Sequence, residues 1–157
     1  METEKSREEM VRETLERVKE TFIEMGCQPE WNGDEVIRVK YQGDALGLIF
    51  GVETVRIIDE SMGYISADDP FLELLKTVIN EANERVFGPS AYTRPLPESD
   101  AIMVYAKYDV SWMPPTELLK SFFHDVIKNF FQLKSYIAFH FKQRKDIITA
   151  TQQESDN

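Results

Sequence analysis

The sequence predicts an α+β domain with a single antiparallel sheet packed against helices, in the order α-β-β-β-α-β-β-α. Two observations predict this class. Along the chain, the spacing of apolar residues changes from the helical repeat of about 3.6 to the strand repeat of two, and back again. The alternating runs also follow one another with short turn-forming connections, which favours antiparallel strands over parallel ones.

The first expected helix begins after Ser6. Ser6 and Glu9 have the spacing of a capping box, in which a hydroxyl and a carboxylate each accept from a backbone N–H group. Gly26 indicates the end of the helix, because glycine adopts the left-handed conformation with little strain. The apolar face of this helix is expected to comprise Val11, Leu15, Val18, Phe22 and Met25.

Three strands are expected next, over residues 35–41, 46–50 and 54–59. The short connections between them predict an antiparallel meander. In the first of these strands, alternation places on one face Ile37, Val39 and Tyr41.

A second helix is expected to start with Asp69 as its N-cap and Pro70 as its first residue, and to end before Gly88. Its apolar stripe includes Phe71, Leu75, Val78, Ala82 and Val86. At ~100° per residue, Asn80 lies nearly opposite this stripe and Asn83 lies on its flank. Asn83 could reach a neighbouring loop or strand, whereas Asn80 is either solvated or contacts another subunit or a ligand.

The segment 90–94 is left open as a strand, because Pro95 and Pro97 disfavour sheet pairing. Residues 101–110 predict a better strand. They are partly apolar on both faces, which indicates either a central strand or an edge strand that another element covers.

The last helix follows Pro114 and Pro115 and remains apolar as far as Phe141. Its apolar side is wider than a surface helix needs, so we expect it to cover the sheet and also to meet a second surface. Beyond this helix the chain is polar and is expected to be a loose tail. The predicted organisation is a tail over 1–6, a single domain over 7–142 and a polar tail over 143–157.

Composition excludes several classes of partner. The chain has 157 residues and a formal net charge of −10, which argues against nucleic acid and against anionic membrane surfaces. Cys27 is the single cysteine, so the chain can form no internal disulfide and no cysteine-based zinc site. The sequence contains no signal peptide and no apolar run long enough to span a membrane. We therefore expect a cytoplasmic protein.

No group of residues predicts catalysis. We interpret His124 and His140 as packing or surface residues, with a pH-sensitive contact as the alternative. The acidic pairs at 59–60 and 68–69 lack the spacing of a calcium loop, although a pair of catalytic carboxylates remains an alternative. Phosphate-binding glycine motifs are absent from the sequence. We expect no enzyme activity, no cofactor and no metal.

Partner contacts are expected at aromatic and amide side chains. A tryptophan beside a turn either covers the core or anchors a partner. One flank of the last helix either packs in the core or lines a dimer interface or groove. The candidate residues are Asn80, Asn83, Trp31, Trp112, Phe123, Ile127 and Phe131.

The string "VINEANERVFG", followed by the strand "AIMVYAKYDV" and a proline-marked helix start, resembles the second half of the YbjN-like family. The resemblance covers roughly residues 7–142, and the family is similar in fold to the class I type III secretion chaperones. YbjN-like proteins are described as sensory or stress-linked regulators, and those chaperones are small, acidic homodimers that hold an extended segment of a partner. The resemblance therefore implies a homodimer that binds a protein or peptide.

Two functions are considered from these observations. The first is a non-enzymatic binding or chaperone-like regulatory module that forms a homodimer. The second is a small-molecule sensor with an aromatic pocket between the last helix and the sheet, where Tyr105, Tyr108 or Arg56 would supply polar contacts.

Overall fold

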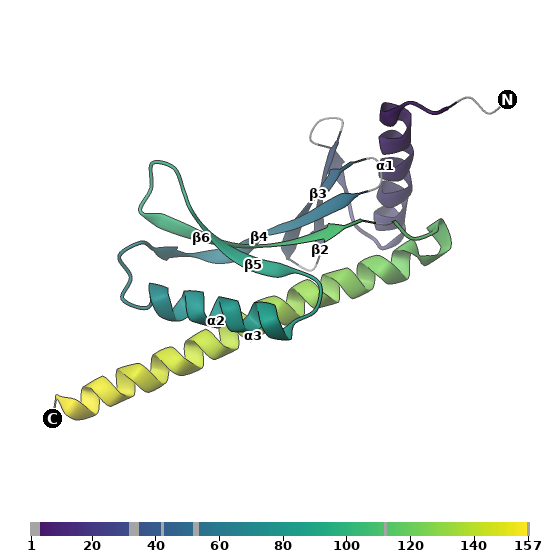
Figure 1. The fold of residues 1–157 in the computed structure, drawn as a ribbon. Coiled ribbons are helices and arrows are strands. Elements are labelled where there is room, and N and C mark those ends of the chain that lie inside the picture. The colour runs from purple at the N-terminus through teal and green to yellow at the C-terminus, as the bar shows by residue number, and fades with distance from the viewer. Residues whose placement is uncertain (1–3, 32–34, 42, 52–53, 112, 157) are drawn as a thin grey trace. The chain divides into compact units, whose positions relative to one another are not determined.

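The computed structural model describes residues 4–31, 35–41, 43–51, 54–111 and 113–156. Within these residues, six strands form one antiparallel sheet that is accompanied by three helices, so the predicted α+β class is confirmed (Figure 1). The strands are β1 (Glu30–Trp31), β2 (Val36–Tyr41), β3 (Asp44–Phe50), β4 (Val55–Ser66), β5 (Ser90–Pro95) and β6 (Ala101–Val110). The helices are α1 (Arg7–Glu24), α2 (Leu72–Arg85) and α3 (Thr116–Ser155).

Hydrogen-bonded neighbours in the sheet follow the order β1-β2-β3-β4-β6-β5. Strand β6 has a neighbour on each side, so the prediction of a central strand is confirmed and the alternative of a covered edge is wrong. Strand β1 is an addition to the predicted order. It consists of two residues, which is too short to leave a periodic signal in the sequence.

The first of two compact units comprises Met1–Ser61 and Lys107–Ile127. In strands β2 and β3 of this unit, buried and more exposed side chains alternate as predicted. Ile37 of β2 pairs with Leu48 of β3, and both side chains are fully buried. The register is fixed by this burial, because a slip of one residue would turn the apolar face of the slipped strand outward.

Helix α1 has the predicted ends. The Ser6 hydroxyl accepts from the Glu9 N–H at 3.2 Å, and the Glu9 carboxylate accepts from the Ser6 N–H at 3.0 Å. Gly26 has a φ of 83°, as expected of a glycine that ends a helix. On its buried face, the Phe22 ring lies 4.7 Å from the ring of Phe123 in α3.

The second unit comprises Met62–Ala106 and Lys128–Asn157. Here the segment that the sequence left open forms strand β5. Because β5 is the last strand in the sheet order, Pro95 falls on an edge strand, where a missing N–H group is tolerated.

Helix α2 begins later than predicted. Its first residue is Leu72 and its N-cap is Phe71, so the assignment of Asp69 and Pro70 to these positions is wrong. Asp69 stabilises the preceding turn instead. Its carboxylate accepts from the Phe71 N–H at 2.8 Å, and its carbonyl accepts from the Leu72 N–H at 3.1 Å.

Strand β4 extends seven residues beyond its expected end at Asp59. Gly63 interrupts the pattern of this extension, and its φ of 124° is one that side chains other than glycine rarely adopt. Residues 60–66 mix acidic, glycine and apolar residues, so the sequence predicts a loop there. In the structure these residues belong to strand β4.

Helix α3 extends through residues 143–155, where the sequence predicted a loose tail. Apart from Ile147, Ile148 and Ala150, these turns are polar and carry no continuous apolar stripe, so periodicity gave no signal. An ion pair one turn apart supports them, because Lys142 Nζ lies 2.8 Å from the Asp146 carboxylate. The single domain over 7–142 stays a prediction.

Candidate functional site

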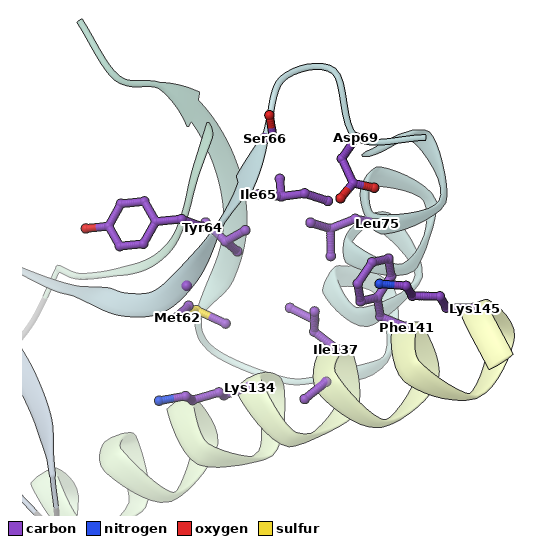
Figure 2. A pocket seen from close by; sticks show the side chains of 13 residues that line it. Met62, Tyr64, Ile65, Ser66, Asp69, Leu75, Lys134, Ile137, Phe141 and Lys145 are labelled. Carbon is purple, nitrogen blue, oxygen red and sulfur yellow. The ribbon is translucent and has the colours of Figure 1, made fainter. Parts of the chain in front are cut away.

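A pocket of about 510 Å³ lies in the second unit (Figure 2). The end of β4, helix α2, strand β6 and the middle of α3 supply its walls. This volume is within the range of small-molecule sites, which is roughly 300–1,000 Å³. The lining residues are Met62, Gly63, Tyr64, Ile65, Ser66, Asp69, Leu75, Val104, Lys134, Ile137, Ala138, Phe141 and Lys145.

The interior of the pocket is apolar. In Figure 2, Ile65 of β4, Leu75 of α2, and Ile137 and Phe141 of α3 point toward one another, whereas Tyr64 points away. Leu75 and Ile137 are buried, while Tyr64 is 63% exposed. Ile137 and Phe141 share one face of α3 because residues four apart are neighbours on a helix.

Two lysines of α3 lie at opposite ends of this apolar wall (Figure 2). Lys134 and Lys145 are eleven residues apart, which places them on nearly the same face and ~16 Å apart along the helix axis. Lys145 Nζ lies 5.1 Å from the centre of the Phe71 ring and 5.8 Å from that of Phe141. Such cation–π contacts hold the ammonium group against the wall of the pocket.

The charged residues that line the pocket are more basic than the protein as a whole. These residues are the two lysines and Asp69, which gives a net charge of +1, whereas the whole chain has a net charge of −10. The Asp69 carboxylate also accepts a hydrogen bond from the Phe71 N–H.

An ion pair between Arg144 of α3 and Glu81 of α2 lies outside the pocket lining. The Arg144 guanidinium donates to both oxygens of Glu81. The hydrogen bond from Arg144 is the main reason that the pKa of the Glu81 carboxyl is lowered. Arg144 is therefore occupied within the unit, whereas the neighbouring Lys145 lines the pocket.

Asn83 makes the contact that the sequence suggested. Its Nδ2 donates to the Ala91 carbonyl at 2.9 Å, and its Oδ1 accepts from the Ala91 N–H at 2.7 Å. Ala91 belongs to edge strand β5 and is 1% exposed. Both polar groups of this amide are thus used within the chain. Asn80 is exposed on the outer face of α2, so its contact with a partner stays a prediction.

The other candidate residues are scattered. Trp31 is 41% exposed, and Lys19 lies over its ring at 4.7 Å. Phe123 and Ile127 are 1% and 4% exposed, so they pack in the core and present no surface to a partner. Phe131 is half-buried. Trp112 lies outside the described residues.

The polar residues considered for a sensor pocket do not line this one. Tyr105 packs beside Tyr92 at 5.6 Å, and Arg56 pairs with Asp109 at 2.7 Å. Tyr108 is also absent from the lining. The pocket is mainly aliphatic, so the expectation of aromatic walls is wrong.

Sequence reasoning missed Lys134 and Lys145. The only signal was their eleven-residue spacing on one helix, with Ile137 and Phe141 between them. Periodicity alone could not separate that pattern from an ordinary amphipathic helix, because basic residues commonly border an apolar stripe.

Metal and membrane sites were also considered. No three His, Cys, Asp or Glu side chains converge on a metal position in the part of the chain that the structure describes. None of the described helices combines the length and the apolar character that crossing a bilayer requires.

Together these elements define an α+β fold of the YbjN-like type, with a pocket lined by β4, α2, β6 and α3. The chain is similar to the crystal structure of "YbjN, a putative transcription regulator from E. coli", with a TM-score of 0.58 and 10% sequence identity. The match covers 83% of this chain and 93% of that chain. At this identity the likeness shows the fold alone. No family model matches the chain, and no curated protein matches it.

Proposed function

We propose that this chain is a non-enzymatic regulatory module of the cytoplasm that forms a homodimer and binds a protein segment. The observation that carries the proposal is the apolar outer face of α3 near its C-terminal end. Phe139 and Ile147 are 61% and 60% exposed there. Large exposed apolar side chains that share one face are typical of interaction surfaces.

The geometry of α3 places these side chains together. At ~100° per residue, Phe139 and Ile147 lie about 80° apart on the helix, and Tyr136 and Gln143 fall between them. Next to them, His140 stacks on Tyr136 with ring centres 4.1 Å apart and meets the edge of Phe139 at 5.2 Å. A second copy of α3 could cover this face by helix pairing.

The resemblance to type III secretion chaperones supports the same proposal, as do the acidic composition and the absence of a catalytic motif from the sequence. An acidic homodimer would suit a partner segment with basic residues. The lone Cys27, which can form no internal disulfide, suits a reducing compartment.

Sedimentation of the double variant F139E/I147E tests the homodimer. We expect the wild-type protein to sediment as a dimer and the variant as a folded monomer, because two buried carboxylates would be unpaired in the interface. Leu118→Glu is the matched control, since Leu118 is 55% exposed at the other end of the same helix. A wild-type protein that is monomeric at high concentration would refute the proposal.

The pocket in the second unit favours a second candidate function, a small-molecule sensor. Its volume and apolar interior are the supporting observations. Thermal-shift measurements with a library of apolar and amphipathic metabolites test it, because a ligand that binds only the folded state raises the melting temperature. If no compound shifts the melting temperature, the sensor function is rejected.

A further inference from the structure

We infer that the pocket in the second unit binds an elongated amphipathic anion, with its apolar body along α3 and its anionic group at the Lys145 ammonium. The inference rests on the second candidate function, and it adds the chemical class of the ligand. An aliphatic monocarboxylate with a chain of about ten carbons represents this class.

The shape of the pocket indicates an elongated ligand. Its wall on α3 spans the three turns between Lys134 and Lys145, which is ~16 Å along the axis. Between these ends, Ile137 and Phe141 face Leu75 of α2, and Val104 of β6 adds to the same lining. An extended alkyl chain would bury its whole length against these side chains, and burial of apolar area is its main source of affinity.

The charge of the pocket indicates an anion. Lys145 is held by the rings of Phe71 and Phe141, and within the described residues no carboxylate forms an ion pair with its ammonium group. The adjacent Arg144 is already paired with Glu81. A ligand carboxylate at this end would thus meet an ammonium group that ring faces hold in place, at low conformational entropy cost.

Asp69 opposes the binding of an anion, because this acidic residue also lines the pocket. Its carboxylate accepts a hydrogen bond from the Phe71 N–H, so one of its oxygen atoms already has a partner within the chain. If Asp69 dominated the electrostatics, the pocket would prefer a cationic amphiphile, so the test includes one.

Isothermal titration calorimetry with three ligands of equal chain length tests the inference: decanoate, 1-decanol and decyltrimethylammonium. We expect decanoate to bind about tenfold more tightly than decanol, as one charge-assisted contact allows, and the difference to shrink as salt rises. In Lys145→Gln this advantage should disappear, while decanol binding stays unchanged. Lys128→Gln is the matched control, because Lys128 is exposed on the same helix and does not line the pocket.

A variant that fills the pocket without unfolding the protein separates loss of the binding site from loss of the fold. Ala138 is exposed at the pocket wall, so Ala138→Phe should leave the melting temperature unchanged and abolish binding of both decanoate and decanol. Equal affinity for decanoate and decanol, or full retention of the advantage in Lys145→Gln, would overturn the anion inference while leaving a small-molecule site. Preference for decyltrimethylammonium would overturn it as well. If none of the three ligands binds, the inference fails, whereas the sensor function fails only if the thermal-shift library also gives no shift in the melting temperature.

Discussion

Replacing Asn83 by alanine should destabilise the protein far more than replacing Asn80 by alanine. The Asn83 amide exchanges two hydrogen bonds with Ala91, at 2.9 and 2.7 Å, as a residue of a neighbouring strand would. Asn83→Ala removes both partners and leaves the N–H and C=O of Ala91 unpaired in a position that is 1% exposed.

The expected loss follows from the number of groups that lose a partner. Each buried backbone group without a hydrogen bond costs about 1–3 kcal/mol, so two groups give about 2–4 kcal/mol when partial access to water is allowed for. For a chain of this length, that corresponds to a fall in melting temperature of about 5–10 °C. Asn80 is exposed on the same helix, where the same substitution should change stability by less than about 0.5 kcal/mol.

Thermal and urea unfolding of the two variants give the comparison, and amide hydrogen exchange reports on Ala91 directly. We expect its N–H to lose protection in Asn83→Ala and to keep it in Asn80→Ala. If both variants unfold within about 1 °C of the wild type, the two hydrogen bonds carry no stability and the reasoning is refuted.

Three further predictions concern other contacts. Ser6→Ala should lower the free energy of unfolding by about 1 kcal/mol through loss of the capping box, as measured by urea unfolding, and Ser121→Ala on an exposed face of α3 should not. Arg144 lowers the pKa of the Glu81 carboxyl, so the stabilisation from this pair should be present above about pH 4.3 and be lost as the pH falls through the lowered pKa. Arg144→Gln lacks this stabilisation, so its free energy of unfolding should fall less in acid than that of the wild type, as measured by urea unfolding at several pH values. Burial raises the pKa of the Cys27 thiol, so iodoacetamide should label the folded protein more slowly than the urea-unfolded protein at pH 8, and equal rates would contradict this.

Local signals in the sequence predicted most of the elements. The capping box at Ser6, the glycine at 26 and the alternation around Ile37 each have a local physical cause, and each is found in the structure. Two of the errors fall where no local signal exists. The end of β4 contains Gly63 and no clear alternation. The last turns of α3 are mostly polar, and ion pairs such as that of Lys142 with Asp146 stabilise them.

The candidate site was less predictable than the fold. The outward position of Asn80 and the reach of Asn83 followed from the helical repeat, which is a local property. The pocket depends on residues from β4, α2, β6 and α3, which no spacing in the sequence brings together. Helix α3 shows the same limit, because its excess of aromatic residues did not reveal that Phe123 is enclosed and Phe139 exposed.

The hydrogen bonds between Asn83 and Ala91 also bear on polymerisation. An edge strand presents free N–H and C=O groups to which a strand of another molecule can add. On β5 the Asn83 amide occupies these groups at Ala91, and Pro95 ends the strand, while the opposite edge strand, β1, is only two residues long. Both edges of the sheet are thus poor templates for growth of a cross-β aggregate. The Asn83 amide therefore hinders the addition of a strand from another molecule to this edge of the sheet.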